Sequence, residues 1–289
     1  MVRPRGRAEG DELMSILKNW RPRGAEIQRP APAPPDYFSV MAQGADFGHE
    51  APAWGEAYRA AQPFPHIVLD GLLDPGLLRR VTAEIPSPLA PNSLFSADVK
   101  HLQERKFAWR DVAALGPEST RLIAFFNGKP FLEFLSTLTG IAGLVPDPYM
   151  WGAGFHQILA GGKLAIHADF NIHPTTQLYR RVNLLLYLNE GWEAAWGGDL
   201  ELWNAAMDAC AAKIAPSFNR LVLFSTSDIS FHGHPEPMTA PPDRVRRSLA
   251  LYYYTYERLA HDEHSTLWRD RPDDGGQVQA AMDDFWKRS

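Results

Sequence analysis

The sequence contains a single cysteine, Cys210, in 289 residues. One cysteine cannot form an intrachain disulfide, which favours a reducing compartment. Long apolar runs are also missing, since no stretch approaches the roughly 18 residues that a transmembrane helix requires. Residues 1–24 lack the apolar core of a signal peptide. We therefore expect a soluble, cytoplasmic protein.

An excess of positive charge is missing as well. The chain has 29 Lys and Arg against 34 Asp and Glu, a formal net charge of −5. This balance gives no reason to expect nucleic acid as the main partner. The chain does have an ordinary globular composition, with 45% hydrophobic residues, and enough length to bury a sizeable core.

The N-terminal region lacks the pattern of a packed domain. Prolines cluster in Arg29–Tyr37, and the apolar residues of 1–60 show no sustained period. We expect 1–60 to be a flexible arm with a transient amphipathic helix over Asp11–Trp20. The folded domain is then expected at 61–260, followed by a helical tail at 261–289.

The folded part is expected to begin with a strand and a helix. Pro63–Leu69 is a short apolar run typical of a strand. Asp74 and Pro75 then carry the signals of a helix start, an N-cap followed by proline at the first helical position, and this helix should run to about Glu84. Apolar faces predict three more helices, at Pro117–Phe126, Pro130–Thr139 and Gln277–Trp286, the last burying Met282, Phe285 and Trp286.

From Met150 onward the pattern changes to short β runs separated by turns. Runs rich in Val, Leu, Tyr and Phe at this spacing are typical of an all-β sandwich or barrel. With helices first and strands later, the sequence predicts a mainly β fold, a jelly roll with supporting helices on the outside. The runs are Gly154–Leu159, Leu164–Phe170, Val182–Asn189, Gly198–Trp203, Lys213–Pro216, Arg220–Thr226 and Ser248–Tyr256.

His167 and Asp169 are the first candidates for chemistry. Residues two apart in a strand point to the same side, so the imidazole and the carboxylate would face one spot. One further histidine would complete a two-histidine, one-carboxylate set for Fe(II) that leaves three coordination positions open. His232 and His234 both follow the strand Arg220–Thr226, and we favour His232 because it is nearer the strand end.

Arg246 and Ser248 form the second candidate pair. They share a face at the start of the last strand, again by the period of two. A guanidinium beside a hydroxyl is suited to binding a carboxylate with two hydrogen bonds. Tyr187 could add a phenolic hydroxyl from a facing strand.

In combination, these segments resemble the prolyl 4-hydroxylase-like group of Fe(II)/2-oxoglutarate dioxygenases. The likeness covers about Phe155–Tyr256 and rests on the order HADF, RRVNLLLYLNEGW, GGDLELW, RLVLFSTSDISFHGHP and RRSLALYYYT. It implies a double-stranded β-helix. The residues it assigns are His167, Asp169 and His232 to Fe(II); Arg246, Ser248, Tyr187 and Gln157 to 2-oxoglutarate; and Arg180 to the substrate.

One departure leaves part of this assignment open. The gap between His232 and Arg246 is longer than in relatives, so His234 remains an alternative metal ligand. Arg244 and Arg247 likewise remain alternatives for the carboxylate, although only Arg246 pairs with Ser248.

The resemblance also implies a reaction. Oxidative decarboxylation of 2-oxoglutarate by O2 would release succinate and CO2 while the substrate is hydroxylated, with ascorbate as a reductant. Related halogenases have a small residue in place of the carboxylate, so Asp169 favours hydroxylation. A prolyl or peptidyl residue, an amino-acid-like molecule and a small metabolite are all open as substrates. The alternative function is a cupin-like module that binds a metal or ligand without oxidative chemistry.

Overall fold

The computed structural model describes residues 40–41, 47–88, 94–95, 99–111, 114–256 and 263–288. The helix expected over Asp11–Trp20 lies outside them. Residues 47–60 of the expected arm are described, and they form helix α2, Phe47–Ala60. The predicted arm is therefore wrong for this stretch. The reason is an aromatic face that packs on α5 (Lys129–Thr139), with the rings of Phe47 and Phe134 4.5 Å apart.

The main strands form one curled sheet whose neighbours are all antiparallel. Its order is β1-β9-β6-β11-β5-β10-β7-β8, which confirms the predicted mainly β jelly roll. The bounds are β1 His66–Asp70, β5 Gly154–Ala168, β6 Tyr179–Tyr187, β7 Leu200–Trp203, β8 Cys210–Ile214, β9 Arg220–Ser225, β10 His232–His234 and β11 Val245–Thr255. Four further strands pair at its margins: β2 Leu94–Phe95, β3 Gln103–Trp109, β4 Val145–Pro146 and β12 Leu267–Trp268.

Strand β5 spans two of the predicted runs, which are one strand in the structure. Gly161 lies within this strand, and its φ of 78° favours glycine. The part before Gly161 pairs with β11, β3 pairs on both sides of it, and the last residues pair with β10 and β12. A single strand thus joins the two halves of the curled sheet.

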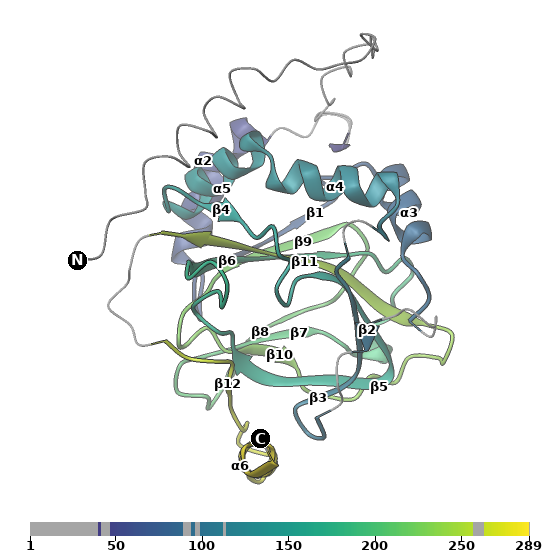
Figure 1. The fold of residues 1–289 in the computed structure, drawn as a ribbon, viewed down its shortest axis with the longest axis vertical. Helices are drawn as coiled ribbons and strands as arrows, with labels where there is room; N and C mark the ends of the chain where they lie inside the picture. The colour runs from purple at the N-terminus through teal and green to yellow at the C-terminus, as the bar shows by residue number, and fades with distance from the viewer. Residues whose placement is uncertain are drawn as a thin grey trace, which may run out of the picture. The chain divides into compact units, whose positions relative to one another are not determined.

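Four helices cover the outer face of the strands β1, β9, β6 and β11 (Figure 1). They are α2, α5, α3 (Pro75–Glu84) and α4 (Pro117–Asn127). The predicted start of α3 is confirmed, since the Asp74 side chain accepts a hydrogen bond from the backbone N–H of Leu77. The predicted ends of α4 and α5 are correct to within one residue.

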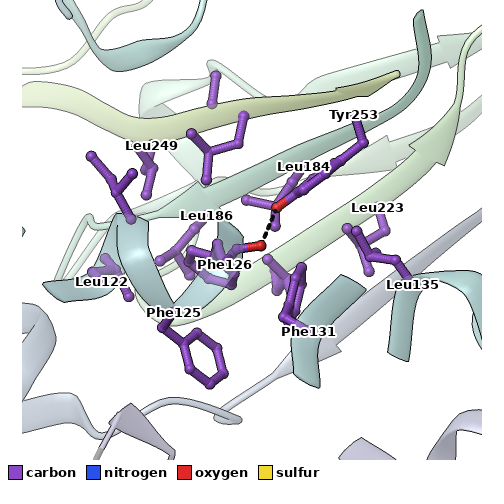
Figure 2. Close-up of a cluster of buried hydrophobic side chains, with 14 of the residues drawn as sticks. Leu122, Phe125, Phe126, Phe131, Leu135, Leu184, Leu186, Leu223, Leu249 and Tyr253 are labelled. Atoms are coloured by element: carbon purple, nitrogen blue, oxygen red, sulfur yellow. Dashed lines mark hydrogen bonds between the residues drawn. The ribbon is translucent and has the colours of Figure 1, made fainter. Parts of the chain in front are cut away.

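The core between helices and sheet is built from one face of each strand. Figure 2 shows Phe126 and Phe131 of the helices packed against Leu184 and Leu186 of β6, and the Tyr253 hydroxyl donates to the carbonyl oxygen of Phe126 at 3.1 Å. Since side chains alternate along a strand, the residues between these leucines face the other way. The inner face of the sheet is therefore not part of this helix-facing core, and its residues line the cavity described below.

The C-terminal segment forms β12 and the helix α6, Gln277–Arg288. The predicted helix is confirmed in position, and Val278 is buried against Leu102 and Ala165. The predicted burial of Phe285 is wrong, because this ring is 46% exposed on a helix that contacts the sheet along one side only. Among the described helices, none combines the length and the apolar character needed to cross a membrane.

The core predicts the effect of removing one of its side chains. Leu186 is fully buried between helices and sheet, so Leu186→Ala should leave a cavity and lower the free energy of unfolding by about 2–5 kcal/mol. Urea denaturation measures this loss. Tyr256→Ala, which removes a side chain that is 89% exposed, is the control and should change stability by about 0.5 kcal/mol or less. A loss below 1 kcal/mol for Leu186→Ala would contradict the described packing.

Candidate metal centre and its cavity

Three side chains that could hold a metal ion meet at one end of β5. His167 lies on the strand, Asp169 follows its last residue, and His232 begins β10 as the register partner of His167. One ligand atom from each residue lies within 4.8 Å of the others. The Asp169 carboxylate oxygens lie 3.6 Å from Nε2 of His167 and 3.5 Å from Nε2 of His232. These separations are close to the roughly 3 Å expected between ligands on one face of an octahedral ion.

Both histidines present the ring nitrogen that a metal requires. Nδ1 of His167 lies 2.9 Å from the carbonyl oxygen of Ala165, and Nδ1 of His232 lies 2.9 Å from that of Ser230. A carbonyl oxygen only accepts, so each Nδ1 carries the proton and each Nε2 has a free lone pair. Two imidazole nitrogens and a carboxylate are a donor set that suits non-haem Fe(II).

The Asp169 carboxylate is fixed by two donors. Nη2 of Arg180 donates to its Oδ2 at 2.9 Å, and Nδ2 of Asn183 donates to the same oxygen at 2.7 Å. Burial alone would raise the pKa of Asp169, but the charge of the Arg180 guanidinium outweighs this effect and holds the pKa well below its usual 3.8. The carboxylate is therefore ionised and oriented.

Arg180 is placed differently from the substrate contact expected of it. Its side chain is 1% exposed, and its Nε donates to Oδ1 of Asn183 at 2.9 Å. The guanidinium lies 3.4 Å from the centre of the Tyr252 ring and 4.7 Å from that of Phe170. Although it borders the cavity, its hydrogen bonds orient Asp169. Asn183 contacts the same carboxylate.

The two candidate histidines on β10, His232 and His234, lie at different distances from the end of β5 where His167 and Asp169 meet. His232 belongs to the three-residue set, whereas His234 pairs with Leu164 farther back along β5. Gly233 between them lets the strands approach, because a Cβ there would lie 2.7 Å from the carbonyl oxygens of Leu164 and Ala165. The geometry therefore favours His232 as the third ligand.

A cavity of about 190 Å³ opens beside the three side chains. Arg246 and Ser248 both line it, as their common face predicts. Nε of Arg246 donates to the carbonyl oxygen of Gly198 at 2.7 Å, and its Nη2 lies 3.2 Å from the Tyr187 hydroxyl oxygen. Tyr187 is fully buried and supports the guanidinium instead of lining the cavity.

Gln157, expected to contact the co-substrate, lies outside the cavity. Its Nε2 donates to the carbonyl oxygen of Pro86 at 2.9 Å, and its Oε1 accepts from Nε of Arg247 at 3.2 Å. The reason is a β-bulge farther along β5. His167 and Leu164 are three residues apart yet oppose His232 and His234, which are two apart, so the strand changes face between Gln157 and His167.

The alternative arginines are also outside the cavity. Arg247 follows Arg246 on the strand and faces away, toward Gln157. Arg244 lies over the ring of Trp196 at 5.3 Å. Among these three arginines, only Arg246 lines the cavity.

Two neighbours of the centre were not expected from the sequence. Lys106 enters the cavity from β3, whose mixed polar sequence has no clear apolar alternation. Trp268 of β12 packs its ring 4.9 Å from that of His167 and lines the cavity with Thr266. The only sequence signal for Trp268 was the apolar pair Leu267–Trp268 within a polar stretch.

Comparisons with known proteins show which family model and which folds this chain resembles. Residues 153–254 match the family model described as 2OG-Fe(II) oxygenase superfamily. A Pseudomonas putida prolyl-4-hydroxylase has a similar fold, at 19% identity and a TM-score of 0.51 over 72% of this chain and 100% of that chain. A prolyl hydroxylase from Trichoplax adhaerens, in complex with a hypoxia inducible factor peptide fragment, matches at 17% identity and a TM-score of 0.50 over 75% and 95% of the two chains. No curated protein matches the sequence.

The buried ion pair predicts a large loss of stability when its cation is removed. Arg180→Met leaves the Asp169 carboxylate without its charged partner, so the free energy of unfolding of the metal-free protein should fall by about 3–5 kcal/mol. Arg181→Met is the matched control, because Arg181 donates to Thr255 and is absent from the cavity lining. Equal losses in the two variants, measured by urea denaturation, would contradict a special role for Arg180.

The burial of His232 predicts a pH dependence. Burial lowers its pKa from 6.5 to about 4, with Asp169 opposing the shift. The unfolded chain therefore binds the proton first, so the stability linked to neutral His232 is complete above pH 6.5 and lost as the pH falls toward 4. Relative to His232→Gln, the metal-free wild type should lose about 3 kcal/mol over this range. Urea midpoints between pH 7 and 4.5 test this, and parallel curves for the two proteins would contradict it.

Proposed function

We propose that this chain, whose residues 153–254 match the family model of the 2OG-Fe(II) oxygenase superfamily, is an oxygenase that uses Fe(II), 2-oxoglutarate and O2, and we assign its residues to that chemistry as follows. His167, Asp169 and His232 bind Fe(II). Arg246, assisted by Ser248, binds the distal carboxylate of 2-oxoglutarate. The single observation that carries the proposal is that the three ligand atoms and Arg246 face the same cavity.

His167, Asp169 and His232 would hold the ion from one side, the side away from the cavity. Three protein ligands would leave positions for a chelating co-substrate and for O2. When bound, the iron supplies the oxidative decarboxylation of 2-oxoglutarate to succinate and CO2 that is coupled to oxidation of the substrate. The protein's own part is to hold the ligands, since Arg180 and Asn183 fix Asp169 and backbone carbonyl oxygens fix both histidines.

Arg246 is oriented before any co-substrate arrives. Its Nε is held by the carbonyl oxygen of Gly198, and the Tyr187 hydroxyl contacts its Nη2. A preoriented guanidinium loses little side-chain entropy when it binds a carboxylate. Ser248, on the same face of β11, adds a hydroxyl donor. Tyr187 acts through Arg246, and we assign no co-substrate contact to Gln157.

The reaction we propose is hydroxylation of a prolyl or peptidyl residue or of an amino-acid-like molecule. The presence of the Asp169 carboxylate supports hydroxylation over halogenation. The two prolyl hydroxylases of similar fold support prolyl chemistry by analogy. The single cysteine supports a reducing, cytoplasmic location, and ascorbate would act as a reductant for the iron.

The test is an anaerobic titration with Fe(II) and 2-oxoglutarate, followed by the weak visible charge-transfer band of the chelate. Wild type should develop the band, and His167→Ala should not. Arg246→Met should weaken 2-oxoglutarate binding about tenfold or more, because a buried charge-assisted pair is lost. Arg247→Met removes the same charge from the opposite face of β11 and should change the affinity less than about twofold.

The possible outcomes separate the competing functions. No band in a fully metal-loaded wild type would overturn the assignment of these residues and favour a cupin-like binding module. A band that is equally weakened by Arg246→Met and Arg247→Met would leave Fe(II) binding intact but remove Arg246 from the co-substrate site.

A further inference from the structure

A second cation enters the cavity at a different point from Arg246. Lys106 of β3 pairs with Ile158 of β5, and Ile158 pairs with Arg246 of β11. Paired residues of adjacent strands project on the same face, so the lysine and the arginine both point inward, on either side of Ile158. With strands about 4.8 Å apart, the two backbones lie about 10 Å from each other. The cavity therefore has two separately anchored cations.

The Lys106 amine has no counter-ion of its own. Within the described part of the chain it forms no hydrogen bond or ion pair, and Asp169 is the only acidic residue that lines the cavity there. That carboxylate already accepts from Arg180 and Asn183. Burial lowers the pKa of Lys106 to about 8, with the Asp169 charge opposing the shift and the Arg246 and Arg180 charges adding to it. The amine therefore stays mostly protonated at neutral pH.

His234 is a second group without a partner. It is 3% exposed and lines the cavity, yet neither ring nitrogen has a hydrogen-bond partner. A buried polar group without a partner carries a free-energy cost that a bound ligand would remove. Arg246, Lys106 and His167 are the charged or titratable groups that act on it. His234 thus lies among the cations of the cavity and offers one more hydrogen bond.

The charges inside the cavity favour an anionic ligand besides 2-oxoglutarate. Arg180 is neutralised by Asp169, and the two charges of Fe(II) equal those of the 2-oxoglutarate dianion. Arg246 and Lys106 then remain in excess, in a partly desolvated space where unpaired charge is costly. A substrate that carries a carboxylate would reduce this excess, whereas an uncharged prolyl peptide segment would leave it unchanged.

We propose that Lys106 and His234 form a carboxylate-binding subsite, and that the substrate is a small molecule bearing a carboxylate. This inference rests on the proposed function and narrows its substrate class. Lys106 forms the ion pair, and His234 donates one ring N–H to the same group. Arg246, anchored on the other side of Ile158, stays with 2-oxoglutarate.

The test uses acetate as the probe and acetamide as its uncharged match. Protein loaded with redox-inert Zn(II) and saturated with 2-oxoglutarate is titrated with each at constant ionic strength, and binding is followed by thermal shift. Acetate should give a saturable stabilisation of wild type, and acetamide should give none. Lys106→Met should weaken acetate binding about tenfold or more, and Lys106→Arg should restore most of it.

Lys163→Met is the control for net charge. Lys163 pairs with Glu104 and is absent from the cavity lining, so this variant should bind acetate as wild type does. Acetate binding that is unchanged in Lys106→Met, as direct coordination to the metal would give, overturns the subsite. So does a tenfold loss of 2-oxoglutarate affinity in Lys106→Met, since Lys106 would then belong to the co-substrate site.

The chelate band of the anaerobic Fe(II) complex separates this test from that of the proposed function. If wild type forms the band but acetate does not bind, only the subsite is overturned. If the band fails and acetate still binds in a Lys106-dependent way, the subsite stands and the oxygenase residue assignment does not.

Discussion

The site depends on a buried carboxylate that is held by a buried cation. Asp169 and Arg180 are both largely removed from water, and desolvation makes each costly on its own. Their pairing, together with the hydrogen bond from Asn183, makes the ionised carboxylate the stable form. Two neutral imidazoles can then share one ion with it, because neither histidine has to supply the charge. The Arg180 guanidinium also lies over the rings of Tyr252 and Phe170, and these contacts help to hold it in place.

The curled sheet makes this pairing possible by separating two environments. Its outer face carries leucines that pack under the helices, so hydrophobic burial stabilises the sheet without using the inner face. The inner face of the same strands carries Asn183, Ser248 and Arg246. Strand β5 connects the two halves, and its bulge turns His167 toward β10. The geometry of the site is therefore a consequence of strand register, and the helices contribute to it only through stability.

Local patterns allowed part of this arrangement to be predicted from the sequence. Asp74 is an N-cap, and Arg246 and Ser248 share a face, because both features depend on spacing within one element. Register between distant strands was beyond such reasoning. The expected place of Gln157 in the cavity depended on such register. The bulge reverses the face of β5 between Gln157 and His167, so Gln157 lies outside the cavity. Pairing with β5 supplies a geometric reason to favour His232 over His234, and this pairing could not be predicted from the sequence. The position of Lys106 in the cavity was not predicted, because the sequence of β3 does not indicate which residues of β5 it pairs with.

The same register explains why the cavity has more positive charge than its proposed co-substrate needs. Arg246 and Lys106 enter from strands that flank β5, so their backbones are separated by two strand spacings. Unpaired cations at such positions lower the stability of the folded protein, and a bound anionic ligand would offset this cost. If Lys106 had a structural role, we would expect it to have an acidic partner within the chain, as Arg180 has in Asp169. The unpaired cation and the unpartnered His234 are therefore better explained by a ligand than by the fold.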